Sequence, residues 1–161
     1  MPVTDFDPAS ADLSLSSLFT GWALSDEIQR RLAGDGFGDA RFADGVIFQH
    51  LVPKPLTIGE LAKRLEVSQQ AASKAVADLE KRGYLSRASD PADGRARLVG
   101  LTARGDAVIA AARRHRAELE TELREKFGAD RLEAARRLLL DVLRHLDADA
   151  PVRSRRVRPP R

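Results

Sequence analysis

The chain has 161 residues, of which 43% are hydrophobic and 32% are charged, a composition that predicts one folded domain and excludes an intrinsically disordered chain. It has no cysteine, which excludes disulfides, thiol catalysis and cysteine-ligated zinc. Removing the five arginines of residues 151–161 from the net charge of +3 leaves −2, so the overall charge is weak evidence for nucleic-acid binding.

Two helices are predicted before residue 53. Ser10 or Asp12 can cap the first, which ends near Gly34 and carries a broad apolar face. The second covers about residues 40–51 and is stopped by Pro53. The residues expected to face inward are Leu15, Leu18, Phe19, Trp22, Ile28, Phe42, Val46, Ile47 and Leu51.

A helix-turn-helix is predicted next. Thr57 followed by Glu60 forms a capping box, which indicates a short helix over about residues 57–65. Ser68 can then cap a second helix that runs to Arg82. Because the intervening turn is so short, the two helices are expected to cross steeply.

A β-hairpin wing is expected after that second helix. Gly83 fits a left-handed helix stop with Tyr84 packed back on the helix. Residues 84–88 and 97–101 flank a polar turn that is rich in Asp, Gly and Arg, the pattern of a hairpin.

The C-terminal part is predicted to form a long helix and a final helix. An apolar stripe begins after Thr102 and extends to Gly128, and Asp130 with Glu133 indicates a second capping box. A stripe of this length needs a partner surface, for which a second copy of the chain is the simplest candidate. The stripe residues expected to face inward are Val108, Ala111, His115, Leu119, Leu123, Phe127, Leu132, Ala135, Leu139, Val142 and Leu146.

The predicted fold class is therefore mostly α with a small β-hairpin wing. A winged helix-turn-helix lobe at about residues 40–102 is joined to dimerisation helices at about 10–35 and 103–147, so that residues 1–150 form a single domain. Residues 151–161 are expected to be an Arg-rich disordered tail.

Four sequence blocks, in this order and spacing, resemble the MarR family (multiple antibiotic resistance regulators) of bacterial repressors. They are LTIGELAKRLEVS, QQAASKAVADLEKRGYL, DPADGRARLVGLT and LTARGDAVI, and the resemblance covers residues 40–115. It implies a homodimer whose terminal helices interlock and whose two lobes grip successive major grooves of a pseudo-palindromic DNA duplex. It also implies, for many members, a small and often aromatic ligand bound between lobe and dimer helices.

The start of the second helix of the helix-turn-helix is expected to contact DNA, because in this motif its N-terminal residues face base edges. Glutamine can bond adenine N6 and N7 together, so Gln69 and Gln70 are expected to read bases. Lys74 suits phosphate, as does Thr57 on the preceding helix. The candidates on the second helix are Ser68, Gln69, Gln70, Ser73 and Lys74.

At the wing, the resemblance assigns Asp93 and Arg95 to the family's Asp-x-Arg element, in which the acid orients an arginine that can enter the minor groove. The alternative is an exposed salt bridge of little energetic weight. Arg87 and Arg97 are expected to contact phosphate along the hairpin.

Three aromatic residues of the first two helices, Phe19, Trp22 and Phe42, are candidates for binding an effector, because family members often line their effector cavity there. Ordinary core packing accounts for them equally well.

Catalysis, metal binding and cofactor binding are not expected. The chain has no nucleophile elbow and no Gly-rich phosphate loop after a strand. His50, His115 and His145 lack the short spacings of a zinc site, and His115 is expected in the core or a dimer interface. Since no secretory signal or membrane-spanning run is recognised, we expect a cytoplasmic location.

The predicted function is sequence-specific DNA binding by a homodimeric repressor of nearby genes that a small-molecule effector releases. Two alternatives remain open at this stage: a constitutive DNA-binding protein without an effector, and a winged-helix module that binds another protein.

Overall fold

The computed structural model describes residues 8–148 except 93 and 95, together with residues 150 and 152. The predicted wing-tip residues Asp93 and Arg95 and most of the predicted tail lie outside the described residues. The elements are η1 (Pro8–Ser10), α1 (Leu13–Leu32), η2 (Ala33–Phe37), α2 (Asp44–Leu51), β1 (Leu56–Thr57), α3 (Ile58–Leu65), α4 (Gln69–Lys81), β2 (Leu85–Ser89), β3 (Arg97–Leu101), α5 (Ala103–Phe127) and α6 (Ala129–His145).

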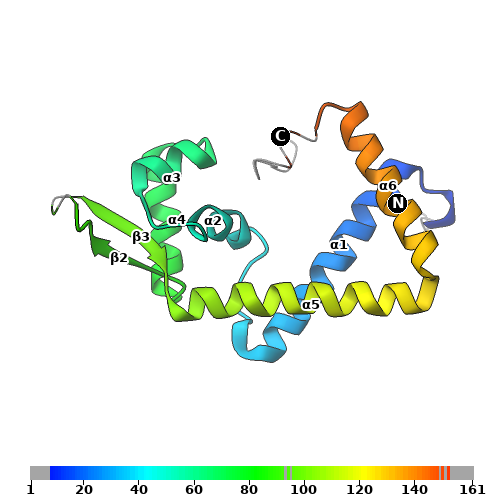
Figure 1. Cartoon of the computed structure of the whole chain (residues 1–161), viewed down its shortest axis with the longest axis horizontal. Helices are drawn as coiled ribbons and strands as arrows, with labels where there is room; N and C mark the ends of the chain where they lie inside the picture. Colours follow the sequence, from blue (N-terminus) through cyan, green and yellow to red (C-terminus); the bar gives the residue numbers. More distant parts are fainter. Residues whose placement is uncertain (1–7, 93, 95, 149, 151, 153–161) are drawn as a thin grey trace, which may run out of the picture.

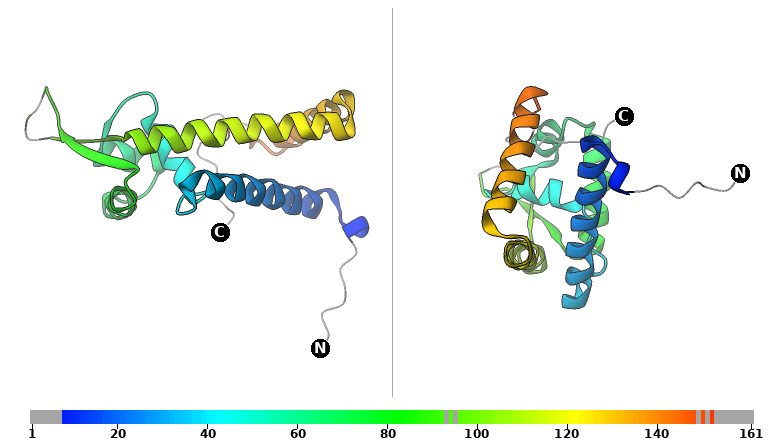
Figure 2. Two further views of the ribbon diagram at one scale, coloured as in Figure 1. Left: turned by 90° about the horizontal axis from the view of Figure 1, so that it is seen from below. Right: turned by 90° about the vertical axis from the view of Figure 1, so that its right-hand side faces the viewer.

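The helices α2, α3 and α4 and the small sheet form a lobe at one end of the long helix α5 (Figure 1). Helix α1 packs against α5 along part of its length, and α6 turns back at the far end of α5 (Figures 1 and 2). The predicted fold class, mostly α with a small β wing, is confirmed. None of the described helices has an apolar stretch long enough to cross a bilayer.

The sheet is antiparallel in the order β1-β3-β2. The predicted hairpin of β2 and β3 is present, with Leu85 opposite Leu101. The two-residue strand β1 was not predicted; it places Leu56 opposite Val99 and so ties the start of α3 to the hairpin. A strand this short leaves no period-2 pattern in the sequence to recognise.

The hydrophobic core lies in the lobe and at the first turns of α5. The long helix contributes Val108, Ile109 and Ala111 to it. Helices α3 and α4 meet through their apolar faces, which buries the side chains that hold the helix-turn-helix together. The largest fully buried side chains are Tyr84, Leu56, Leu61, Leu79, Val76 and Val99.

The helix boundaries follow from local side-chain chemistry. The predicted capping box is formed, since Thr57 Oγ1 accepts from the Glu60 amide at 3.2 Å and Glu60 Oε2 accepts from the Thr57 amide at 2.8 Å. At the other end of the helix-turn-helix, Gly83 has φ of 78° and the Tyr84 amide donates to the Leu79 carbonyl at 2.9 Å. The predicted helix stop is therefore a Schellman motif.

The second predicted capping box, Asp130 with Glu133, is wrong. Helix α6 begins at Ala129 and has no side-chain cap. A single residue, Gly128, separates α5 from α6, with φ of 89° and ψ of 141°. Because the next helix starts immediately after this glycine, Asp130 is already inside the first turn and cannot serve as its cap.

Several residues expected to face inward are exposed in the single chain. Phe42 precedes α2 and is 70% exposed, so its predicted inward position is wrong. The apolar faces of α1 and α6 are likewise uncovered, because only the last turn of α1 and the first turns of α5 reach the core. The exposed residues of these two faces include Leu15, Leu18, Phe19, Trp22, Leu138, Leu139, Leu140 and Leu146.

Candidate nucleic-acid interface

The N-terminus of α4 is open to solvent. Ser68 caps it by accepting from the Ala71 amide at 3.1 Å, and Gln69, Gln70 and Lys74 are exposed. A helix N-terminus concentrates unpaired amide donors and positive dipole, which suits phosphate oxygen. The segment predicted to enter the groove is thus accessible at the end that the prediction requires.

The two neighbouring glutamines differ in environment. The amide of Gln69 lies against α3, where a Cβ added to Gly59 would be 3.3 Å from Gln69 Nε2. Gln69 and Gly59 also line a shallow open hollow beside α3 with Lys63. Gln70 follows about 100° further around the helix, so it faces a different direction from Gln69. The same role is predicted for both glutamines, but their surroundings differ in the structure.

Two hydroxyl candidates are less available than expected. Ser73 is half-buried on α4. The Thr57 hydroxyl both accepts from the Glu60 amide and donates to Glu60 Oε2 at 3.0 Å, so the cap already uses it. The backbone hydrogen bond to Thr57 is the first cause of the lowered pKa of Glu60, which therefore stays ionised. A phosphate contact by Thr57 would compete with this cap.

The two hairpin arginines lie on different strands. Arg87, on β2, is exposed but has Glu80 Oε2 of α4 at 3.3 Å from its Nε, a pair that holds the hairpin to the helix. Arg97, on β3, is exposed and lies opposite Ser89 in the ladder. The candidates at the hairpin tip, Asp93 and Arg95, are outside the described residues.

The C-terminal end of α4 is fixed by Arg82, a contact that the sequence did not predict. Its Nη1 and Nη2 atoms bind the two carboxylate oxygens of Asp44 at 2.6 and 3.0 Å, and Nη2 also lies 2.6 Å from Asp78. Asp44 is only 7% exposed, so the pair is largely desolvated. Removing one partner would leave a buried charge without compensation. Arg82 therefore locks α4 onto α2.

A second polar cluster lies where α4, η2 and α5 meet. The hydroxyl of Tyr84, whose side chain is fully buried, donates to Asp39 Oδ1, which also accepts from Arg104 Nη2 at 2.9 Å. The Arg104 guanidinium stacks on the rings of Tyr84 and Phe37 at 4.9 and 5.3 Å from their centroids. Burial, and next the hydrogen bond to Asp39, raise the pKa of Tyr84 to about 12.

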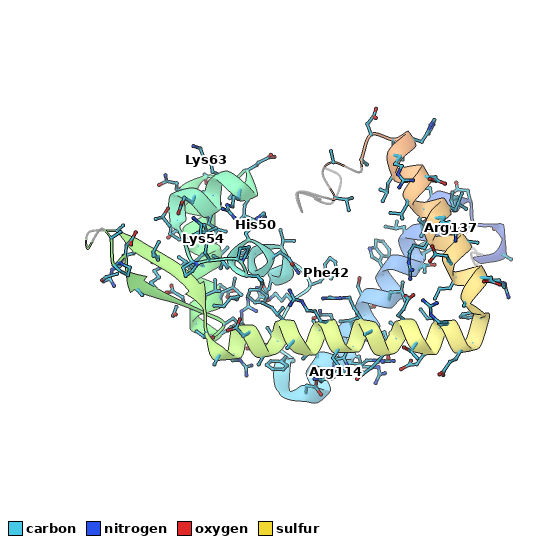
Figure 3. All side chains as sticks on the ribbon, viewed as in Figure 1. Phe42, His50, Lys54, Lys63, Arg114 and Arg137 are labelled. Carbon is cyan, nitrogen blue, oxygen red and sulfur yellow. The ribbon has the colours of Figure 1, made fainter. Side chains whose placement is uncertain are left out.

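The effector candidates come from two parts of the chain. Phe19 and Trp22 form an edge-to-face pair on α1 with ring centroids 5.8 Å apart. Phe42 lies at the edge of the lobe, in the direction of α1 (Figure 3). All three side chains are more than 40% exposed, so they are not part of the hydrophobic core of the single chain.

Over the part of the chain that the structure describes, no group of three or more metal-ligating side chains comes together. His115 is buried on α5, as predicted for a core or interface histidine, while His145 is exposed at the end of α6.

Residues 47–96, which contain α3, α4 and the first hairpin strand β2, match the sequence model of the MarR family. This segment of the chain is therefore similar to the MarR family. The match ends before α5, so the arrangement of the long helices is compared by structure. No curated protein sequence matches the chain significantly.

Solved structures of MarR-type regulators share the fold over most of the chain. MepR from Staphylococcus aureus, a transcription regulator of a multidrug efflux pump, has a TM-score of 0.65 at 20% identity, covering 84% of this chain and 99% of MepR. A MepR mutant bound to an oligodeoxyribonucleotide has a TM-score of 0.62 at 21% identity, covering 85% and 99%. Ligand-free MarR from Escherichia coli has a TM-score of 0.59 at 24% identity, covering 83% and 97%.

Of these structures, MepR is described as a transcription regulator. The chain has the winged-helix fold of the MarR family, from the N-terminal helix to the helices that follow the wing.

Proposed function

We propose that the chain is a homodimeric repressor that binds a pseudo-palindromic DNA site through α4 and the wing and is released by a small-molecule effector. The observation that carries the DNA-binding part is the open N-terminus of α4, where Gln70 and Lys74 are exposed on a helix that Arg82 holds firmly at its other end. In this geometry a rigid helix presents a bidentate base reader and a phosphate contact together.

We assign the remaining DNA contacts by the docking geometry of the helix-turn-helix. Ser68 and the amides beside it would fix phosphate, and Arg97 would contact the backbone flanking the groove. We retain Gln69, Thr57 and Arg87 as weaker candidates, since they already contact α3, the cap of α3 and Glu80, respectively. Ser73 is also a weaker candidate, because it is half-buried. Asp93 and Arg95 keep their proposed role at the tip of the wing.

The dimer is supported by the uncovered apolar faces of α1 and α6. Trp22 on α1 is 58% exposed, and Leu138 on α6 is 52% exposed. Apolar faces of this extent on a monomer mark an interaction surface. A second copy that buried them would place two recognition helices about one DNA turn apart. Residues 1–150 would then act as one unit, with helices 10–35 and 103–147 forming the dimer.

An effector is proposed for the aromatic surface formed by Phe19, Trp22 and Phe42. Flat exposed rings stack on aromatic ligands, and a ligand held between α1 and the lobe would change the spacing of the two lobes. A dimer contact through the same rings is the competing use of this surface. A thermal-shift screen with aromatic acids distinguishes the two, because only an effector raises the midpoint at constant protein concentration.

The proposal is tested by selecting duplexes from a random pool with the full chain and measuring affinity across a salt series. We expect an enriched inverted repeat and a binding constant that falls steeply with salt, as counterions are released from phosphate. Binding of every duplex alike would support a constitutive, nonspecific DNA-binding protein. If no duplex binds at any salt concentration, the proposal is contradicted and the alternative of a protein-interaction module is favoured.

A further inference from the structure

The ring of His115 on α5 lies between two carboxylates. Its Nε2 atom is 2.7 Å from Asp35 Oδ2 of η2, and its Nδ1 atom is 2.9 Å from Glu118 Oε2 of α5. A neutral imidazole has one N–H, so it can donate to only one of these acceptors. Only the protonated ring satisfies both, and it does so at a site where His115 is 8% exposed.

The other charges around the ring come from α5 and α1. Arg114 Nη2 lies 2.5 Å from Asp35 Oδ2 and 3.4 Å from His115 Nε2 (Figure 3 labels Arg114 on the side of α5 that faces η2). Arg31 of α1 is 3.9 Å from Glu118 Oε2, but it also binds Glu27 and Glu122. The hydrogen bond from His115 is the first cause of the lowered pKa of Asp35, with Arg114 contributing after it.

Asp35 is the first residue of a short segment whose other end contacts the C-terminal end of α4. This segment, residues 35–39, is called the strap below. It turns at Gly36, whose φ is 87°. At its other end the Asp39 side chain accepts from Tyr84 and Arg104, and its carbonyl oxygen accepts from Arg82 Nη1 at 2.8 Å. Since Arg82 is the C-cap of α4, the strap connects His115 of α5 to the end of the helix proposed to read DNA.

We propose that the strap is a protonation-dependent fastening of α4: a protonated His115 holds Asp35 on α5 and fixes the orientation of α4, and loss of that proton loosens the strap and weakens DNA binding. This inference rests on the proposed DNA-binding function. Imidazole is the side chain that changes charge between about pH 5 and 8. The fastening gains its second hydrogen bond only with the proton bound, so the effect is present when the ring is protonated and is lost when a rise in pH removes the proton.

The strap does not detach completely when the ring is neutral, because Arg114 still binds Asp35. We therefore expect a graded change and not an on-off switch. A recognition helix held in its bound orientation loses less conformational freedom on binding, which raises affinity. Coupling between sites typically changes affinity by about 5- to 150-fold, and a partial loosening of the strap should lie toward the low end of that range.

The test measures the affinity of the full chain for its selected duplex by fluorescence anisotropy between about pH 5.5 and 8.5 at constant ionic strength. We expect the wild-type affinity to fall by about five- to twentyfold with rising pH. His115→Gln should flatten this profile, and Asp35→Asn, on the more exposed side of the contact, should flatten it as well. The matched control His145→Gln removes an exposed histidine outside the cluster and should keep the wild-type profile.

The proposal would be overturned if His115→Gln kept the pH dependence of DNA affinity seen in the wild type. It would also be overturned if His145→Gln lost that pH dependence. If the wild type binds no duplex at any pH, the proposed function fails and the strap is tested without DNA. Amide-exchange protection at residues 35–39, corrected for the intrinsic rate, should then fall with pH in the wild type and not in His115→Gln. Protection that is independent of pH in both proteins would overturn the strap itself.

Discussion

The hydroxyl of Tyr84 donates a 2.5 Å hydrogen bond to Asp39 Oδ1, and this contact joins the residue after the Gly83 helix stop to the segment that follows α1. Tyr84 is fully buried, and its ring also packs on Phe48 of α2 at 5.7 Å between centroids. Ionisation of this phenol would place a second negative charge beside Asp39 inside the lobe. The neutral form is therefore part of the folded state.

Tyr84 should titrate at unusually high pH. Its pKa is raised from 10.0 to about 12, so its contribution to stability is complete below pH 10 and is lost as the pH rises through about 12. The chain has one tyrosine, so tyrosinate absorbance follows this group alone. Asp39→Asn should lower the midpoint, and Tyr84→Phe should remove this part of the alkaline loss of stability. A midpoint near 10 in the folded protein would contradict the expectation.

Gly105→Ala should destabilise the lobe. A Cβ at Gly105, in the first turn of α5, would overlap the carbonyl oxygen of Tyr84 and come within 3.0 Å of Leu101. The backbone of Tyr84 cannot move without disturbing the helix stop before it, so we expect a loss of at least about 2 kcal/mol in urea unfolding. Gly45→Ala in α2 is the control: it meets nothing within 4 Å and should be neutral or stabilising by up to about 1 kcal/mol.

Gln70→Ala should relax base preference more than Gln69→Ala. The lost bidentate contact corresponds to about 1–3 kcal/mol of discrimination at one base pair, whereas Gln69 is held against Gly59. Arg95→Ala should weaken binding to most sequences alike. Competition anisotropy with duplexes that differ at single positions measures both effects. Unchanged affinity and preference in Gln70→Ala and Arg95→Ala together would show that the proposed docking is wrong.

Leu139→Glu should weaken the dimer at least about tenfold, because it places a charge in the apolar face of α6. Sedimentation equilibrium measures the change, and fluorescence of the single tryptophan, Trp22, on dilution provides a second readout. Val67→Glu, at a similarly exposed apolar residue in the turn of the helix-turn-helix, is the control and should stay dimeric. Truncation after Leu146 should also stay dimeric. A monomeric wild type at micromolar concentration would contradict the assignment.

The sequence predicted those features that depend on neighbouring residues. The caps at Thr57 and Ser68 and the stop at Gly83 each involve partners within a few positions, so their residue types locate the helix ends closely. The recognition helix was therefore predicted to within one residue of its bounds. The same reasoning failed at Asp130. This residue type is typical of a helix cap, but α6 begins at Ala129, so Asp130 already lies inside the helix.

The contacts that position the recognition helix could not be predicted in this way. Tyr84 and Asp39 are 45 residues apart, and His115 and Asp35 are 80 apart. Their pairing depends on how η2 packs against α5, and the periodicity of hydrophobic residues in the sequence does not predict such packing. The exposure of Phe42 and of the α1 and α6 faces has a similar cause: an apolar stripe predicts that a face will be covered, but it does not say which surface covers it.

Gly128 alone joins α5 to α6, with backbone angles that residues bearing a Cβ strongly avoid. Because a single residue makes this corner, inserting another residue there would change the direction in which α6 leaves α5 and the side to which its leucines face. The backbone conformation of Gly128 therefore sets the direction of the leucine-rich helix α6. Lengthening this bend would redirect the apolar face of α6, the surface that we propose to meet a second copy of the chain.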